Sequence, residues 1–286
     1  MTPARMTELS IGTSRLSLWV LRSVPARPEG RVLLLGGSNF DLRLKRDFLN
    51  SALEQRFEIL TYEPRGIGRS DCPEGDWRME DYASDAAALM DAVGWERADV
   101  LGESFGGMTA LHLAHLFPAR VSRLAVASAT AGGAGGGSAD IGWLLDLPRA
   151  EAAAEALMLL DAENHAIRDS DPVAFDLRVA ARMAFDAAFA DPSVEGGGYL
   201  RLLSARAAHD ISAALPDIGH DTLVITGGRD RQAPPAAQAA MAELLPNSEQ
   251  RVYDAGHGVA FATDEPMQDL CERWAMVTPH AHSGRG

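Results

Sequence analysis

Three residues whose side chains can together perform acyl transfer stand at glycine-rich positions of this sequence. Ser104 is the centre of the pentapeptide Gly-Glu-Ser-Phe-Gly, Asp230 follows Gly-Gly-Arg, and His257 stands between two glycines. A serine hydroxyl is a poor nucleophile at neutral pH, so it needs a base within hydrogen-bond reach and a third group that orients this base. We therefore predict that Ser104 is the nucleophile, His257 the general base and Asp230 the acid that orients the imidazole.

The pentapeptide around Ser104 favours a sharp turn from a strand into a helix. An apolar run, 98–101, precedes it, and a helix-like stretch, 108–116, follows it. Residues two before and two after such a serine must be small, because the backbone is strained and side chains there would collide with the strand and the helix. Gly102 and Gly106 meet this demand. The pattern also occurs in turns without chemistry, but the flanking elements and the chain order serine, aspartate, histidine favour a catalytic interpretation.

An oxyanion that develops on a substrate carbonyl needs two amide donors. The amide of Phe105 would stand at the N-terminus of the predicted helix, where the helix dipole favours negative charge. The second donor is expected in the glycine-lined loop 36–40, which follows a buried strand, and Ser38 is our candidate. A plain turn built on the two glycines of this loop is the alternative. Phosphate binding is not supported, because the loop lacks a Gly-Lys-Ser/Thr sequence.

The strands and helices that would position these residues alternate along the chain. Strand-forming runs, of which the apolar ones are typical of strands buried on both faces of a parallel sheet, occur at 31–35, 57–62, 98–101, 121–127, 222–226 and 250–253. Helical patterns occur at 79–93, 108–116 and 259–276, and the runs 9–11 and 16–21 favour an antiparallel edge hairpin. The acid and the base each follow a strand of this series, and the ends of parallel strands gather catalytic groups on one edge of a sheet. The sequence therefore predicts an α/β fold with a mostly parallel central sheet flanked by helices.

The alternation of strands and helices stops after residue 131. The run 132–138 is rich in glycine, and residues 140–214 are rich in alanine and helical in pattern, with no convincing strand. We therefore predict an α/β core formed by residues 1–131 and 216–286, interrupted by an inserted helical cap at 132–215. The last ten residues, 277–286, are expected to form a disordered tail.

Substrate identity is expected to depend on apolar side chains that line a pocket under the cap. Our candidates for substrate contact are Phe40, in the loop that carries Ser38, and Trp143, Met183 and Phe185 in the cap. The cap also contains arginines that can bind a carboxylate, although exposed helix faces explain them equally well: Arg178, Arg182, Arg201 and Arg206. The preference between neutral and acidic substrates stays open.

The composition excludes several classes of partner. The chain has 26 Lys and Arg residues against 40 Asp and Glu residues, and its net charge of −14 argues against binding to nucleic acid or to anionic membranes. Cys72 and Cys271 lie far apart and form no Cys-x-x-Cys unit, so neither a disulfide framework nor a metal site is indicated. No run approaches about 18 apolar residues, and the N-terminus lacks an apolar signal region. We expect a cytoplasmic protein whose partner is a small-molecule substrate, and whether it forms a homo-oligomer is open.

Several segments of the sequence resemble the α/β-hydrolase superfamily, and the resemblance covers nearly the whole chain outside the cap. Residues 33–37 are similar to the family's oxyanion strand, 64–71 to its Arg-Gly-x-Gly-x-Ser loop, and 223–235 to its acid-bearing segment. Many members have His-Gly where this chain has Gly36-Gly37, which removes an imidazole but leaves the triad untouched. Some members carry the acid after the strand that corresponds to 121–127, and no carboxylate follows that strand here, which supports Asp230.

The resemblance implies a serine hydrolase that cleaves an ester or thioester of a small, apolar substrate through an acyl-enzyme. No metal or organic cofactor is required, because protein groups supply the nucleophile and the electrostatic stabilisation. A carbon-carbon bond hydrolase or a lactonase on the same fold is the alternative among enzymes. A ligand-binding protein without catalysis is the alternative from a different class, because a fold does not dictate function.

Overall fold

The computed structural model describes residues 4–133, 137–193 and 197–276. The tail expected at 277–286 and part of the glycine-rich run lie outside the described residues.

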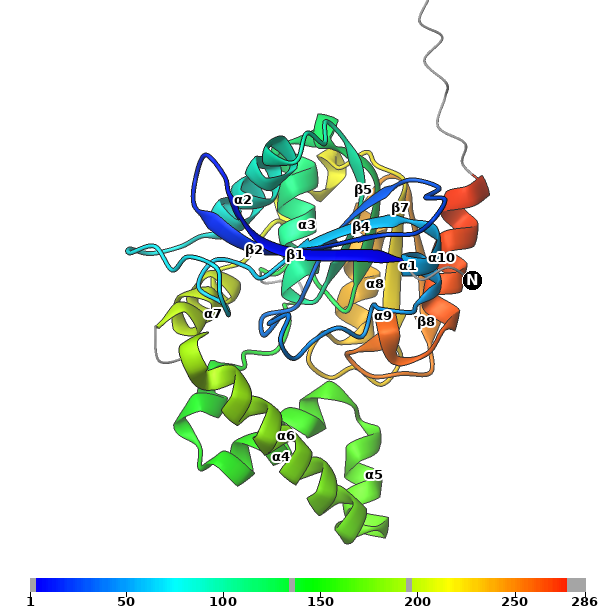
Figure 1. Cartoon of the computed structure of the whole chain (residues 1–286). Coiled ribbons are helices and arrows are strands. Elements are labelled where there is room, and N and C mark those ends of the chain that lie inside the picture. The colour runs from blue at the N-terminus through cyan, green and yellow to red at the C-terminus, as the bar shows by residue number, and fades with distance from the viewer. Residues whose placement is uncertain (1–3, 134–136, 194–196, 277–286) are drawn as a thin grey trace, which may run out of the picture.

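The centre of the molecule is an eight-stranded sheet with the strand order β1-β2-β4-β3-β5-β6-β7-β8 across the described chain (Figure 1). The first two strands pair antiparallel, β2 pairs antiparallel with β4, and all further neighbours are parallel. The mostly parallel sheet and the antiparallel edge predicted from the sequence are thereby confirmed. The strands are β1 (Arg5–Gly12), β2 (Ser17–Val24), β3 (Arg31–Leu35), β4 (Glu58–Tyr62), β5 (Ala98–Glu103), β6 (Val121–Ala127), β7 (Thr222–Gly227) and β8 (Ser248–Tyr253).

Helices cover both faces of this sheet (Figure 1). The helices among the described residues are α1 (Ala52–Arg56), α2 (Met79–Ala92), α3 (Phe105–Leu116), α4 (Arg149–Leu160), α5 (Glu163–Ser170), α6 (Pro172–Ser193), α7 (Gly198–Ala207), α8 (Pro235–Leu244), α9 (Val259–Ala262) and α10 (Glu265–Met276), with short 3-10 helices η1 (Pro118–Arg120), η2 (Gly142–Asp146) and η3 (Ser212–Asp217). The stretch 259–276, expected as one helix, is divided into α9 and α10. The physical reason is Pro266, which has no N–H to donate to the carbonyl of Ala262 and therefore favours the start of a new helix.

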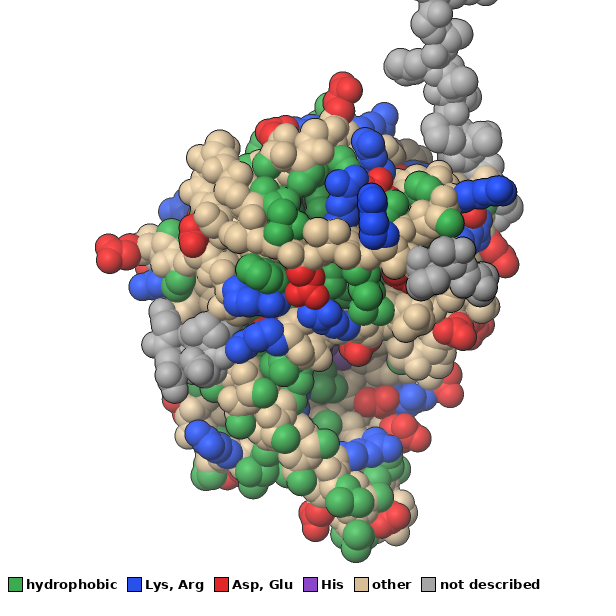
Figure 2. Space-filling view, in the orientation of Figure 1, with side chains coloured by type: hydrophobic (Ala, Val, Ile, Leu, Met, Phe, Trp, Pro, Cys, Tyr) green, Lys and Arg blue, Asp and Glu red, His purple; other side chains and the backbone are tan. Residues whose placement is uncertain are grey.

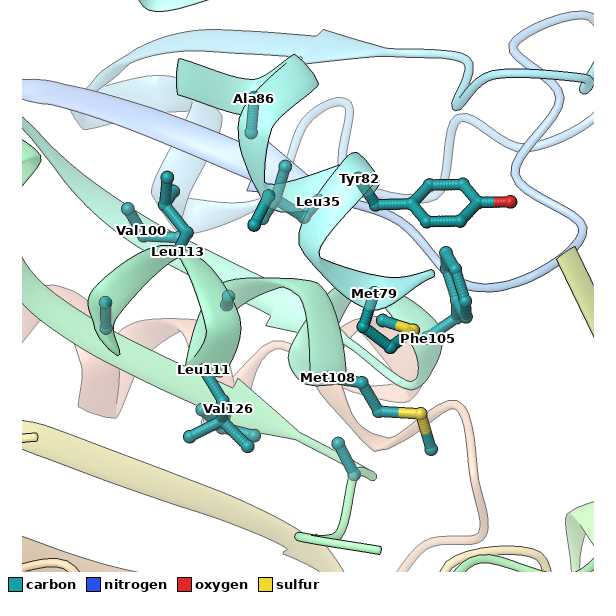
Figure 3. Packing of buried hydrophobic residues seen from close by; sticks show 14 of the residues in the cluster. Leu35, Met79, Tyr82, Ala86, Val100, Phe105, Met108, Leu111, Leu113 and Val126 are labelled. Carbon is teal, nitrogen blue, oxygen red and sulfur yellow. The ribbon is translucent and has the colours of Figure 1, made fainter. Parts of the chain in front are cut away.

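Two hydrophobic clusters hold the sheet, one on each face. Side chains of β3 alternate between them: Leu33 and Leu35 belong to the cluster under α2 and α3, and Val32 and Leu34 to the cluster under α1 and α10. Figure 3 shows the first cluster, in which Leu35 and the side chains of β5 and β6 pack against α2 and α3. Each fully buried aliphatic side chain stabilises the fold by about 1.5–3 kcal/mol. The two clusters therefore stabilise the strands that carry the site.

The chain leaves the sheet after β6, forms η2, α4, α5, α6, α7 and η3, and returns at β7. We call residues 142–217 the helical segment. Its helices α4, α5 and α6 stand away from the sheet, below it in the view of Figure 1. The two ends of the excursion meet, because Gly132 pairs with Asp210 and the N–H of Ile211 donates to the carbonyl of Ala131 at 2.9 Å. The division into a core and a cap at residues 132 and 215 stays a prediction.

Candidate active site

Ser104 lies in a strained turn between β5 and α3. Its φ of 55° and ψ of −117° place it in a region that residues other than glycine seldom occupy. A Cβ atom on Gly102 would lie 2.3 Å from the carbonyl oxygen of Gly106, and one on Gly106 would lie 2.0 Å from the carbonyl oxygen of Leu35. Both distances are shorter than any real contact, so only glycine allows the helix to start this close to the neighbouring strands.

The structure brings Ser104, His257 and Asp230 together at one edge of the sheet. Nε2 of His257 lies 2.8 Å from Oγ of Ser104, and Nδ1 of His257 lies 2.9 Å from Oδ2 of Asp230. All three side chains are buried. A carboxylate only accepts hydrogen bonds, so Nδ1 carries the proton and Nε2 presents its lone pair to the serine hydroxyl. This tautomer can remove a proton from Ser104.

The second carboxylate oxygen of Asp230 is satisfied by backbone groups. Oδ1 accepts hydrogen bonds from the amides of Gln232 and Ala233 at 2.9 and 2.8 Å. Hydrogen bonds of this kind fix the plane of the carboxylate, which leaves Oδ2 directed at the imidazole. Oδ1 thus holds the buried side chain in place through the backbone, and Oδ2 is left to accept from His257.

The end of α4 is attached to both loops that carry the acid and the base. The amide of His257 donates to the carbonyl of Leu160 at 2.6 Å, and the amide of Arg231 donates to the carbonyl of Leu159 at 3.1 Å. The guanidinium of Arg229 also pairs with Asp161 at 2.9 Å. The helical segment therefore fixes the loops beside Ser104 as well as covering them.

Gln232 is a neighbour of His257 that sequence reasoning missed. Its side-chain Nε2 lies 2.9 Å from Nε2 of His257, the nitrogen that also faces Ser104, and the side chain is buried. Glutamine two residues after the acid belongs to no motif, so only the fold reveals this contact. The amide holds the imidazole from the side opposite to Asp230's contact at Nδ1.

The two predicted oxyanion donors both lie close to Ser104. Phe105 is the first residue of α3, so its N–H has no carbonyl partner inside the helix. Ser38 lines the same cavity as Ser104, and a Cβ on neighbouring Gly37 would lie 3.6 Å from Cβ of Ser104. Tyr199 lines the same cavity, and burial raises the pKa of its phenol.

Two adjoining cavities meet at the site. The serine chamber, of about 290 Å³, is lined by Gly37, Ser38, Asn39, Lys45, Glu103, Ser104, Ile141, Leu144, Ala156, Leu160, Arg182, Phe185, Tyr199, Gln232, His257 and Gly258. The apolar chamber, of about 260 Å³, is lined by Asn39, Ile141, Leu144, Leu145, Leu147, Arg149, Ala152, Ala156, Arg182, Met183, Asp186, Ala187, Phe189, Ala190 and Tyr199. Several residues line both, so the chambers adjoin. Figure 2 shows a hollow between the sheet-bearing body and the helical segment on the face in view.

Two of the four predicted substrate contacts line these chambers and two do not. Phe185 lines the serine chamber and Met183 the apolar chamber. Phe40 is only 4% exposed and packs against Phe48 with 6.4 Å between the ring centroids, so it belongs to the core. Trp143 is 40% exposed, donates its indole N–H to the carbonyl of Asp140 and lines neither chamber.

Among the four arginines considered for a carboxylate, Arg182 alone lines the two chambers of the described chain. Arg178 donates to Oδ1 of Asn164 at 2.9 Å, and Arg206 donates to the carbonyl of Ala139 at 2.9 Å. Arg201 lies against the ring of Trp77. These three guanidinium groups have structural contacts outside the chambers.

Glu103, the residue before Ser104, brings a carboxyl group into the serine chamber. Burial raises the pKa of Glu103 above its usual range, while the nearby charges of Lys45 and His257 oppose this shift without cancelling it. A raised pKa means that this carboxyl carries less negative charge near neutral pH than an exposed one. Neither Glu103 nor Lys45 was a site candidate from the sequence, because their approach to Ser104 depends on the turn and on the loop after β3.

Within the described residues, no group of three or more His, Cys, Asp or Glu side chains is arranged to hold a metal ion. None of the helices described here is long and apolar enough to cross a membrane.

Comparison with known proteins links this geometry to one family. A family model described as "alpha/beta hydrolase fold" matches residues 31–262. A Caulobacter vibrioides protein named for carbamate hydrolysis is 28% identical over 92% of this chain and 97% of its own length. The 3-oxoadipate enol-lactonase 2 of Acinetobacter baylyi is 29% identical over 71% of this chain and 73% of its own length.

Solved structures share the fold. The enol-lactonase from Burkholderia xenovorans LB400 superposes with a TM-score of 0.70 at 23% identity and covers 94% of this chain and 98% of its own. A 2-hydroxy-6-oxo-6-phenylhexa-2,4-dienoate hydrolase from Rhodococcus sp. strain RHA1 superposes with a TM-score of 0.74 at 19% identity, covering 96% and 100%. At these identities the likeness concerns the fold alone.

Proposed function

This chain belongs to the alpha/beta hydrolase family, and we propose that it is a serine hydrolase that cleaves a carboxylic ester or thioester. The observation that carries the proposal is the continuous hydrogen-bonded series from Asp230 through His257 to Ser104 on the wall of a chamber. A hydroxyl that lies 2.8 Å from an imidazole lone pair is placed for activation as a nucleophile.

In the proposed reaction, Oγ of Ser104 attacks the substrate carbonyl carbon while Nε2 of His257 takes the hydroxyl proton. The oxyanion of the tetrahedral intermediate accepts hydrogen bonds from the amides of Ser38 and Phe105. When the intermediate collapses, the bond to the alcohol or thiol breaks and His257 returns the proton to this leaving group. Asp230 keeps the imidazole oriented and stabilises the imidazolium throughout.

Deacylation repeats these steps with water. His257 removes a proton from a water molecule, whose oxygen attacks the acyl carbon bound to Ser104. Collapse of the second intermediate returns the proton to Oγ of Ser104 and releases the carboxylic acid. Every proton and electron pair is accounted for by the substrate, water and the three side chains, so the proposed cycle uses no cofactor.

A cyclic ester is the second candidate, favoured by the names of the enol-lactonase relatives. The same attack by Ser104 would open a lactone ring, and the leaving alkoxide would stay attached to the acyl group. Two adjoining chambers can hold the two ends of such an opened chain. Carbon-carbon bond cleavage would also use the three side chains, whereas ligand binding without turnover would leave them unused.

The test combines covalent labelling with hydrolysis of p-nitrophenyl esters of increasing acyl length. A fluorophosphonate probe is expected to label the wild-type protein stoichiometrically at Ser104, located by intact mass and peptide mapping. Ser104→Ala is expected to lose the label and to lower kcat by roughly 10⁴- to 10⁶-fold. Ser84→Ala, on the surface of α2, is the matched control and should retain both properties.

Two results would contradict the proposal. Full turnover by Ser104→Ala would require another nucleophile. Absence of labelling and of turnover, together with tight binding of a small molecule, would favour a binding protein on a hydrolase fold.

A further inference from the structure

Lys45 is the only lysine in the sequence, and it lines the serine chamber together with Ser104. It lies in the loop that follows β3, where its amide donates to the carbonyl of Asp41 at 2.8 Å. Its side chain is half-buried, and its ammonium lies 5.8 Å from the centroid of the Phe185 ring. The chain thus places its one compact, strongly hydrated cation on the wall of the chamber that holds the nucleophile.

In the part of the chain that the structure describes, no carboxylate oxygen lies within 4.0 Å of the Lys45 ammonium. The charge of Lys45 acts on the Glu103 carboxyl of the same chamber, but the two groups form no ion pair within 4.0 Å. Partial burial of a cation costs free energy unless an anion or polar groups compensate it. Since no ion pair of the described residues compensates the Lys45 ammonium, an anion that enters the chamber can do so.

A second cation faces the same ring. The Arg182 guanidinium lies 6.0 Å from the centroid of Phe185, on the side of the helical segment, and lines both chambers. Its Nε donates to Asp186 at 2.8 Å, which fixes the plane of the guanidinium. The remaining donors of a guanidinium fork can serve a further acceptor. Lys45 from the core and Arg182 from the helical segment therefore both lie near the Phe185 ring and both line the serine chamber.

We propose, on the basis of the proposed serine hydrolase function, that the substrate is an ester, thioester or lactone whose acyl part carries a second, ionised carboxylate bound by Lys45. Arg182 is the second cation of this subsite, and the apolar chamber takes the uncharged part of the molecule. The sequence left open whether the enzyme prefers a neutral or an acidic substrate. The proposed subsite favours an acidic one.

Glu103 has to be weighed against this assignment, because its carboxyl lines the same chamber. Burial raises the pKa of Glu103, which lowers its mean negative charge and so its repulsion of an incoming carboxylate. Asp186 pairs with Arg182 and offsets part of the guanidinium charge, so Lys45 is the main positive charge on the wall of the chamber and Glu103 opposes it only in part. The local charge around Phe185 therefore favours an anion.

The experiment compares monoethyl esters with diethyl esters of straight-chain dicarboxylic acids from succinate to suberate, with acid release followed in a pH-stat. The members of each pair differ in one negative charge. The wild-type protein is expected to prefer the monoester at the best chain length. Lys45→Met is expected to raise KM for this monoester by roughly ten- to a hundredfold and to leave the diester within about twofold.

Two further variants separate the role of the charge from that of the fold. Lys45→Arg keeps the charge and should restore most of the preference. Arg178→Met removes a cation of the helical segment that contacts Asn164 outside the chambers, and it should change neither ester. Equal losses on both esters in Lys45→Met, or a wild-type protein without preference for the monoester, would overturn the carboxylate subsite.

A binding arm keeps this inference distinct from the proposed hydrolysis. Ser104→Ala is titrated with the monoester and the diester by calorimetry, with and without Lys45→Met. One outcome is that the monoester binds more tightly than the diester and that this difference depends on Lys45, while the protein with Ser104 intact neither hydrolyses esters nor reacts with the probe. This outcome would support the carboxylate subsite and contradict the serine hydrolase. Labelling and turnover without any charge preference in binding would retain the hydrolase and reject the subsite.

Discussion

At the scale of single residues, the geometry of the site depends on which hydrogen bonds each polar atom of Asp230 and His257 makes. Oδ1 of Asp230 accepts two backbone amides and Oδ2 faces Nδ1 of His257, so one carboxylate both anchors itself and fixes a tautomer. Nε2 of His257 in turn faces two groups, the Ser104 hydroxyl at 2.8 Å and the Gln232 amide at 2.9 Å. An imidazole nitrogen has one lone pair, so only one of these two donors can use it at any instant.

We predict that Gln232→Met lowers kcat by about two- to tenfold and leaves KM within about twofold, because one hydrogen bond that positions the imidazole is lost. Steady-state kinetics on a neutral ester measures the split between the two constants. Gln55→Met, on the exposed side of α1, is the control. A raised KM with unchanged kcat would instead show that Gln232 contacts the substrate from the chamber wall.

Residue type and local spacing predict that Ser104, Asp230 and His257 lie together, and the structure places His257 within hydrogen-bond distance of the other two, while their catalytic roles stay a prediction. Type and spacing were not enough for Gln232 or Lys45, whose positions depend on contacts between distant segments. Aromatic type alone was also insufficient. Phe40 and Trp143 look like pocket residues in the sequence, but Phe40 packs in the core and Trp143 is 40% exposed, and neither lines the two chambers.

At the scale of elements, glycines set how closely the nucleophile turn approaches its neighbours. A Cβ on Gly106 would lie 2.0 Å from the carbonyl oxygen of Leu35 and 2.7 Å from that of Gly36, and both atoms belong to backbone that leads to Ser38. Backbone cannot yield as the end of a flexible side chain can. The start of α3 and the loop after β3 therefore form one unit.

We predict that Gly106→Ala lowers the free energy of unfolding by about 1–3 kcal/mol through overpacking and reduces hydrolysis of a neutral ester strongly, because the oxyanion loop must shift. Denaturant titration and ester kinetics measure the two effects. Gly219→Ala is the control, since nothing lies within 4 Å of the added Cβ, and it should change stability by less than about 0.5 kcal/mol. Similar losses in both variants would contradict the close approach at Gly106.

The strands of the parallel sheet could be predicted where burial on both faces leaves a continuous apolar run, as in residues 32–35 of β3. The attachment of α4 to the loops after β7 and β8 could not, because it uses backbone groups that carry no sequence signal. The same limit applies to α1, whose five residues are too few for a helical period to be seen.

At the scale of the whole molecule, the chain's excursion into the helical segment begins and ends at one place. Near the closure between residues 131–132 and 210–211, His209 meets His112 of α3. Nε2 of His209 lies 3.0 Å from the carbonyl oxygen of Thr130, so it carries a proton, and Nδ1 of His209 accepts from Nε2 of His112 at 3.2 Å. Both imidazoles are neutral in this arrangement, and both are buried.

Burial, with a smaller contribution from His209, lowers the pKa of His112 to about 4, and burial lowers the pKa of His209 as well. The charge of Glu80 acts in the opposite direction and raises the pKa of both histidines. Asp210 also raises the pKa of His209, whereas Arg206 lowers it further. Because the folded-state pKa lies below the value of 6.5 for a free histidine, the unfolded chain binds more protons at mildly acidic pH. The contribution of His112 to stability is therefore present above pH 6.5 and is lost as the pH falls toward about 4.

We predict that the wild-type protein loses about 2 kcal/mol of unfolding free energy through His112 alone between pH 7.5 and pH 5, since each unit of pKa difference corresponds to about 1.4 kcal/mol. His112→Gln keeps an N–H donor for His209 but cannot take up a proton. Its free energy of unfolding should therefore fall by about 2 kcal/mol less than that of the wild type over the same interval.

His115→Gln, an exposed position on α3, is the control and should follow the wild type. Denaturant titrations at several pH values measure the difference between the curves, which removes the acid sensitivity of the carboxylates common to all three proteins. Parallel curves for the wild type and His112→Gln would mean that His112 takes up its proton as readily in the folded protein as in the unfolded chain, which would contradict the lowered pKa of this buried imidazole.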